Sequence, residues 1–284
     1  MTALAWLLLA AVFFLIVVEL AVRFARLTDF PLYRRDDAVG YIPASNQAGA
    51  FLRKNDFAFN DYGMGVDEAF HPASNDILLI GDSITHGGTS FPQRQRLGPL
   101  LEKRTGRRVW PIGAVSWALK NELRYLLGRT EVLEVATLVL IVNSADLGKA
   151  STWRGEGRHP TRRPSIATTY LIRKALARIG LVHDLPGADS TPDATYWRDD
   201  FNHLVSLCAG RIHVVLYPQR DEIGSLEDRF AVLRRVLAQA DSAKVSICDL
   251  SELARWDRRF YHDNFHPSVT GNHALADMIA SQIG

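Results

Sequence analysis

The most uniform hydrophobic stretch of the chain lies at its start. Residues 3–22 are apolar or uncharged except for Glu19, and a helix of that length spans about 30 Å, the hydrocarbon thickness of a bilayer. A buried helix of a soluble protein is rarely apolar on every face. A cleaved signal peptide would carry a basic start and a small-residue cleavage site, which this segment lacks. The pattern therefore predicts a retained transmembrane anchor within residues 1–24.

Beyond residue 76, short apolar runs alternate with amphipathic stretches. Runs rich in β-branched residues occupy positions 76–81, 107–112, 136–142, 211–217 and 244–250. Patterns typical of helices occupy positions 96–106, 118–128, 226–240 and 272–283. This alternation is typical of a parallel sheet covered by helices on both faces. We therefore predict an α/β fold for residues 76–284, a three-layer α/β/α sandwich with a five-stranded parallel sheet of flavodoxin-like form.

Two segments depart from this alternation. Residues 25–75 are turn-rich, and we expect a juxtamembrane segment that packs on the domain, with a short hairpin in residues 50–59. Residues 147–200 form an insertion. It contains a basic stretch with Arg154, Arg158, Arg162 and Arg163, followed by a helical pattern near 167–180. The simplest interpretation of the basic stretch is a solvated loop. The alternative is a lid that attracts an anionic polymer or a lipid headgroup.

Composition limits the classes of function. The 33 Lys and Arg residues nearly balance the 31 Asp and Glu residues, so the net charge of +2 gives no reason to expect nucleic-acid binding. Two cysteines, Cys208 and Cys248, are too few for a disulfide scaffold or a four-cysteine zinc site, and whether they pair is left open. The sequence has no phosphate-binding or dinucleotide glycine pattern and no metal-ligand spacing, so we expect no cofactor and no metal.

Candidate chemistry lies at two distant places. Ser83 follows the first strand of the predicted sheet, and ligand sites of open α/β sheets lie at the carboxyl ends of strands. A serine there could equally be a helix cap. Near the other end of the chain, Asp263 and His266 are three residues apart. A serine hydroxyl needs a base such as histidine, and a carboxylate can orient that histidine. The three residues together therefore predict a catalytic triad.

These motifs resemble those of the GDSL/SGNH hydrolase superfamily. Residues 81–85 read Gly-Asp-Ser-Ile-Thr, like its first block, and residues 263–267 read Asp-Asn-Phe-His-Pro, like its last. The resemblance covers roughly residues 76–284 and implies an SGNH fold with Ser83 as nucleophile, His266 as general base and acid, and Asp263 as the group that orients His266.

The family's oxyanion hole is less well preserved. Its third block is usually Gly-x-Asn-Asp, where this chain has Asn143 without the glycine and Ser144 in place of the aspartate. The resemblance implies that the Asn143 amide donates to the oxyanion and that Asp146 does part of the missing aspartate's work. A backbone N–H is expected after the second strand, and both Ser116 and Gly113 are candidates to provide it.

The resemblance implies a serine esterase acting on an acyl ester, such as an O-acetyl group on a glycan, through an acyl-enzyme. A polysaccharide O-acetyltransferase would use the same triad, and a third alternative is a non-catalytic module that binds carbohydrate or lipid. Arg23, Arg26, Arg34 and Arg35 follow the apolar span, and positive flanks favour the cytoplasmic side. Because glycan-modifying relatives work outside the cytoplasm, we nevertheless expect an extracytoplasmic catalytic domain on a single-pass membrane protein.

Overall fold

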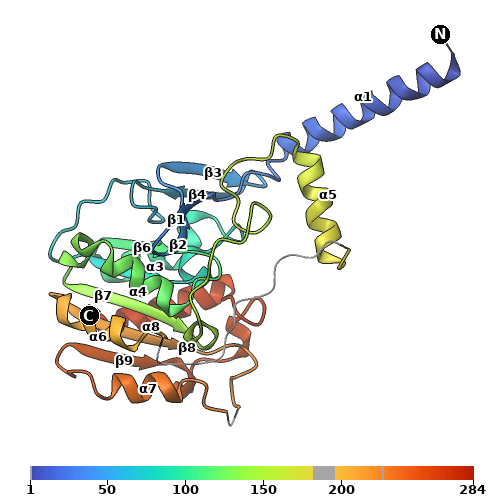
Figure 1. Cartoon of the computed structure of the whole chain (residues 1–284). Coiled ribbons are helices and arrows are strands. Elements are labelled where there is room, and N and C mark those ends of the chain that lie inside the picture. Colours follow the sequence, from blue (N-terminus) through green and yellow to red (C-terminus); the bar gives the residue numbers. More distant parts are fainter. Residues whose placement is uncertain (1, 182–195, 226) are drawn as a thin grey trace.

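A parallel sheet forms the centre of the molecule (Figure 1). The computed structural model describes residues 2–181, 196–225 and 227–284. Five strands lie in the order β6-β5-β7-β8-β9, all parallel. They are β5 (Ile77–Gly81), β6 (Val109–Gly113), β7 (Thr137–Asn143), β8 (Arg211–Tyr217) and β9 (Val245–Asp249). Each lies on one of the five apolar runs, so the predicted fold class is confirmed.

Helices cover both faces of the sheet. One face packs against α4 (Leu119–Leu127), α6 (Arg198–Leu207) and α7 (Ala231–Leu237), and the other against α3 (Leu97–Thr105) and α8 (Val269–Ile283). Successive strand side chains alternate between the two cores, as Leu78 and Leu79 do, because side chains of a β-strand point to opposite faces. Cys208 and Cys248 are buried free thiols in the cores on opposite faces of the sheet. The two cysteines therefore do not form a disulfide.

The segment before the sheet folds into two antiparallel hairpins. The first pairs β1 (Tyr33–Asp36) with β2 (Gly40–Pro43), and the second pairs β3 (Gln47–Phe51) with β4 (Asn55–Phe59). The second is the hairpin expected in residues 50–59, and the first has no counterpart in the sequence-based expectations. Tyr41 of β2 is buried in the core shared with α4 and reaches the loop after β6. Its hydroxyl donates to the Val115 carbonyl (2.6 Å), and its own carbonyl accepts from Trp117 Nε1 (2.9 Å).

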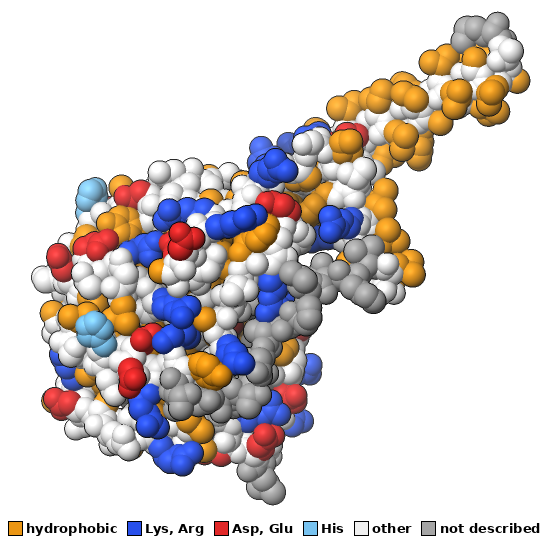
Figure 2. All heavy atoms as spheres, viewed as in Figure 1, with side chains coloured by type: hydrophobic (Ala, Val, Ile, Leu, Met, Phe, Trp, Pro, Cys, Tyr) orange, Lys and Arg blue, Asp and Glu red, His pale blue; other side chains and the backbone are white. Residues whose placement is uncertain are grey.

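Helix α1 (Ala3–Phe24) projects away from this domain (Figure 1). Its mean hydropathy is 2.7 over its most apolar window and none of that window is buried. Apolar side chains cover its surface in Figure 2. Within the residues that the structure describes, it is the one helix long and apolar enough to cross a membrane.

Helix α5 (Ala167–Arg178), which lies in the insertion, is placed unlike the other helices. It packs beside the domain-proximal end of α1 and not on a face of the sheet (Figure 1). The remaining helix, α2 (Ser83–His86), is a single turn that directly follows β5. The strand order reverses direction at β5, because β6 lies on one side of it and all later strands on the other. This reversal marks the place where open α/β sheets bind ligands.

Candidate active site

Ser83, His266 and Asp263 form a continuous chain of contacts. The Ser83 hydroxyl lies 3.0 Å from His266 Nε2, and His266 Nδ1 lies 2.8 Å from Asp263 Oδ2. The serine and the histidine are 183 residues apart in sequence. The structure thus brings together the three residues expected to form a triad, with a separate partner for each nitrogen of the imidazole. A base oriented in this way can accept the proton of a serine hydroxyl.

A tight loop presents the acid and the base together. Asp263 Oδ1 accepts from the backbone N–H groups of Phe265 (2.8 Å) and His266 (2.7 Å). Partial burial raises the pKa of Asp263, but these hydrogen bonds and the one from the His266 ring outweigh it, so the pKa lies below its ordinary value. Asp263 therefore stays ionised and fixes the orientation of the imidazole. The side chains of His266 and Asp263 are 40% and 48% exposed, so a substrate can reach them.

The nucleophile lies at the end of a strand and the start of a helical turn. Asp82 caps α2 by accepting from the Ile84 N–H (2.8 Å), which fixes the turn that carries Ser83. The Ser83 hydroxyl also lies 3.2 Å from Asp82 Oδ2, a second polar contact besides His266. The cap of this turn is therefore Asp82 and not Ser83, which is the first residue of α2 and lies next to the His266 imidazole.

Asn143 ends β7, as expected for an oxyanion donor, and is almost fully buried. Its Nδ2 donates one hydrogen bond to the Tyr217 carbonyl (3.2 Å), while Oδ1 accepts from the Ala145 N–H (2.9 Å). An amide nitrogen has two hydrogens, so one donor of Asn143 has no acceptor among the described residues, but Asn143 is not among the residues that line the cleft beside Ser83. Asp146 accepts from the Asn143 backbone N–H (2.9 Å), a local bond of the kind expected of the missing aspartate.

Ser116 and Gly113, the two candidates for the backbone N–H donor, lie in different surroundings near the end of β6. Ser116 has φ of +64°, in the left-handed region that favours glycine, and it lies in the turn closed by the Trp117 N–H and the Ala114 carbonyl (3.2 Å). Gly113 is buried within β6, where a Cβ would lie 2.6 Å from the Asp82 carbonyl. Gly113 thus allows the close packing of β6 on the turn at Asp82, whereas Ser116 lies in the loop beyond the strand with a left-handed backbone.

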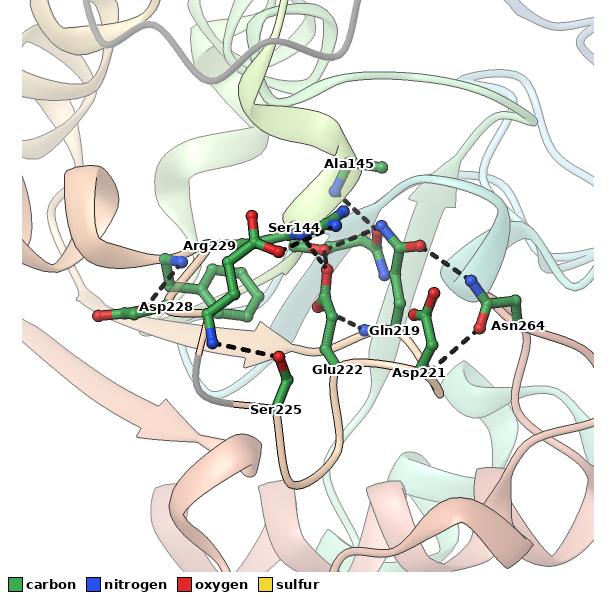
Figure 3. A network of polar contacts seen from close by, with 12 residues as sticks. Ser144, Ala145, Gln219, Asp221, Glu222, Ser225, Asp228, Arg229 and Asn264 are labelled. Carbon is green, nitrogen blue, oxygen red and sulfur yellow. Dashed lines mark hydrogen bonds and ion pairs between the residues drawn. The ribbon is translucent and has the colours of Figure 1, made fainter.

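A polar network beside this site has no signal in the sequence (Figure 3). The Ser144 hydroxyl donates to Glu222 Oε1 (2.6 Å) and accepts from Gln219 Nε2 (3.0 Å). Gln219 Oε1 in turn accepts from Asn264 Nδ2 (3.1 Å), and Asn264 lies between the two triad members of the last loop. The Ser144 side chain, at the end of β7, is thus connected through Gln219 to the loop that holds Asp263 and His266.

Three carboxyl groups are buried behind the serine, those of Asp82, Glu122 and Asp146. Burial raises the pKa of each of them, and the charge that each would impose on the others raises the pKa of Glu122 and Asp146 further. Neither carboxyl oxygen of Glu122 has a hydrogen-bond partner among the described residues. Each shift favours the neutral form of the carboxyl, most strongly for Glu122 and Asp146.

The triad opens into a small cleft of about 180 Å³. Besides the triad it is lined by Ile84, Gly87, Gly88, Ser90, Phe91, Val115, His262 and Pro267. No group of three His, Cys, Asp or Glu side chains within the described ranges could hold a metal ion.

Comparisons with known proteins find similar solved structures but no matching family model or curated protein. Among solved structures, a family two carbohydrate esterase from Clostridium thermocellum is 13% identical, with 76% of this chain and 65% of that chain covered and a TM-score of 0.46. A carbohydrate esterase family 2 enzyme from Corynascus thermopiles is 13% identical, with 81% and 70% covered and a TM-score of 0.46.

A third match is a member of the lipolytic protein G-D-S-L family from Veillonella parvula, 14% identical, with 73% and 97% covered and a TM-score of 0.43. The chain spans just under two thirds of the length of the Clostridium esterase. The roles of individual residues rest on this chain's own geometry.

Proposed function

We propose that this protein is a membrane-anchored serine esterase of the SGNH type that hydrolyses esters of small acyl groups. The observation that carries the proposal is the unbroken contact from Ser83 Oγ through the His266 ring to Asp263, at 3.0 and 2.8 Å. A non-catalytic binding module would have no need for a histidine with both ring nitrogens oriented in this way.

In the proposed reaction, Ser83 Oγ attacks the ester carbonyl carbon while His266 Nε2 takes the hydroxyl proton. The carbonyl oxygen becomes an oxyanion, which accepts hydrogen bonds from the free N–H of the Asn143 amide and from the backbone N–H groups of Ser83 and Ser116. Collapse of this intermediate breaks the bond to the alcohol, which leaves with the proton held by His266. Water then attacks the carbonyl carbon of the acyl-enzyme while His266 Nε2 takes its proton. The bond to Ser83 Oγ breaks, Ser83 Oγ regains the proton from His266, and the acid is released.

The size of the cleft favours a short acyl group. Sites that enclose drug-sized ligands have volumes of roughly 300–1,000 Å³, whereas the cleft beside Ser83 has about 180 Å³. An acetyl ester fits that space, and a glycan bearing O-acetyl groups would present its sugar ring to the open mouth. We expect aryl acetate to be hydrolysed with a higher kcat/KM than aryl octanoate, and the reverse order would contradict this choice of acyl group.

The retained anchor is supported by contacts between α1 and the domain. Glu19 Oε1 accepts from the Ala167 N–H (2.9 Å), and Glu19 Oε2 accepts from the Thr168 N–H (2.8 Å). Removal of α1 as a signal peptide would take this carboxylate away from the start of α5. We expect intact mass measurement of the membrane-extracted protein to find residues 3–22 present, and carbonate washing to leave the protein in the membrane, because burial of apolar surface is not screened by salt.

We place the catalytic domain outside the cytoplasm, where a glycan ester would be found. A C-terminal fusion to alkaline phosphatase should be active there, and a fluorescent protein that folds only in the cytoplasm should stay dark. The opposite pair of results would follow the arginines after the span and would remove the support for a glycan substrate.

A fluorophosphonate probe on the full-length protein in detergent tests the nucleophile before any substrate is known. The wild type should be labelled once, and Ser83→Ala should not be labelled. Ser90→Ala is the matched control, because Ser90 lines the same cleft without contacting the imidazole; it should be labelled like the wild type. Labelling that persists in Ser83→Ala, or is absent from the wild type, would contradict the proposal. Partition of the acyl-enzyme between water and an added sugar acceptor would reveal a transferase.

A further inference from the structure

One face of α5 is apolar and uncovered. Ile172 and Ile179 are seven residues apart, about two helical turns, and so lie on the same face; they are 53% and 69% exposed. Ile166, just before the helix, and Leu181, just after it, are also exposed (55% and 71%). Large apolar side chains exposed together in this way mark a site of interaction.

The opposite face of α5 rests on the domain. The Tyr170 ring stacks on Phe30 at 5.2 Å between ring centroids, and Lys174 Nζ lies 5.8 Å from the centroid of the same ring. Tyr170 and Lys174 are four residues apart, so they share one face of the helix. This contact turns Ile172 and Ile179 away from the domain.

The start of α5 is fastened to the end of the apolar span. In addition to its two backbone acceptor bonds, Glu19 accepts from the Thr168 hydroxyl (2.7 Å), and Arg23 Nη2 donates to the Ser165 carbonyl (2.6 Å). From this junction α5 runs away from the axis of α1 (Figure 1), and the apolar surface of one helix continues onto the other (Figure 2). The depth of α5 relative to α1 is therefore fixed at the end of the membrane-spanning stretch.

Basic side chains surround the same junction (Figure 2). Arg23 and Arg26 are 48% and 51% exposed, and Arg173 is exposed on α5 beside the apolar face. Helices that lie in a membrane surface combine an apolar face with Lys and Arg at its borders, where the cations meet lipid phosphates.

We propose that α5 lies in the headgroup region of the bilayer that α1 crosses, with Ile172 and Ile179 directed into the upper acyl chains. The occupant of the apolar face is thus lipid, and the insertion is a second, in-plane contact that fixes the tilt of the catalytic domain on the membrane. This proposal rests on the proposed anchoring by α1 but not on the esterase activity.

Nitroxide-lipid quenching in the full-length protein tests this directly. Ile172→Cys and Ile179→Cys are labelled with an environment-sensitive fluorophore and reconstituted at one copy per lipid nanodisc, with nitroxides on the lipid acyl chains. Ile247→Cys is the matched control, an isoleucine that is 42% exposed on β9, away from α1 (Figure 1). The unsubstituted protein reports any labelling of the two buried cysteines. We expect nitroxide lipids to reduce fluorescence at positions 172 and 179 by about twofold and to leave position 247 unchanged.

Each other outcome has a defined meaning. Equal quenching at positions 172 and 247, in protein that co-elutes with the disc, would overturn the proposal. A blue-shifted but unquenched probe at position 172 would also overturn it, because protein and not lipid would cover α5. Protein that stays out of the disc would overturn the anchoring and this proposal together. A thermal unfolding transition like that of the wild type verifies the folding of each variant. Quenching in a protein without esterase activity would reject the proposed function and support this proposal.

Discussion

Replacing Ser116 with glycine separates a backbone role from a side-chain role in the oxyanion hole. Ser116 has φ of +64° in the turn after β6, and its hydroxyl makes one long contact, with Arg158 at 3.4 Å. If the backbone N–H is the functional group, glycine preserves it. Ser116→Ala is the matched control, since it removes the same hydroxyl and keeps the backbone in a conformation that alanine disfavours.

The expected magnitudes follow from the backbone conformation. A left-handed φ costs a non-glycine residue about 1–2 kcal/mol, which glycine avoids. Glycine in turn lowers the stability by roughly 0.5–1 kcal/mol because it gives the unfolded chain more conformational freedom. The net gain for Ser116→Gly is therefore about 0.5 kcal/mol in the free energy of unfolding, or about 1–2 °C in Tm. Ser116→Ala gains nothing by this argument. The kcat of both variants should stay within about threefold of wild type, because loss of a true donor costs about 10²–10³.

Paired thermal scans and aryl acetate kinetics measure both quantities on the same preparations. A fall in kcat of about 10² or more in both variants, with KM unchanged, would refute the backbone assignment and make the hydroxyl the donor. A lower Tm for Ser116→Gly than for Ser116→Ala would refute the strain argument independently of activity.

The other predictions concern neighbouring side chains. Asn143→Ala should lower kcat by roughly 10²–10³ with little change in KM; a change in KM alone would make Asn143 a substrate contact. Gln219→Leu disconnects Ser144 from Asn264 and should lower kcat by up to about 10² without preventing folding, and unaltered kinetics would limit the network to stability. Burial raises the pKa of Glu122, so the folded protein keeps a proton that the unfolded chain releases, and stability falls as pH rises above the ordinary value. The Tm of Glu122→Gln relative to wild type should therefore rise between about pH 5 and pH 8; a constant difference would contradict an ionisable, buried Glu122.

The central strands of the sheet could be predicted because they are apolar runs buried on both faces. Runs such as 136–142 and 211–217 are visible in the sequence whatever their neighbours are, and β7 and β8 lie on them. The hairpin β1–β2 was not predicted, since its four-residue strands include Arg34 and Arg35 and show no regular alternation. Its stability comes from Tyr41 and its contacts in the loop after β6, which are invisible to a local pattern.

The residues of the candidate site likewise fall into those that the sequence identifies and those that it does not. Ser83, Asp263 and His266 belong to short motifs, so the sequence identifies them as partners although only folding brings them together. Gln219 belongs to no motif, because its partners Ser144 and Asn264 are 75 and 45 residues away in sequence. Glu19 illustrates a different limit: an acidic residue in an apolar span suggests proximity to the interface, but its partners in α5 are 148 and 149 residues away.

Ser83 and His266 are 183 residues apart in sequence, and this separation also decides when, during synthesis, the proposed active site can form. During synthesis, β5 and its serine emerge long before the loop that holds the histidine. A serine hydroxyl without a base is no stronger a nucleophile than any other alcohol in the cell. Parallel strands pair only after long loops close, a slow step that leaves the partly made chain open to unwanted contacts. In the proposed mechanism, dividing the triad between two distant parts of the chain keeps the nascent chain inert until the loop between β9 and α8, which holds His266, has folded beside Ser83.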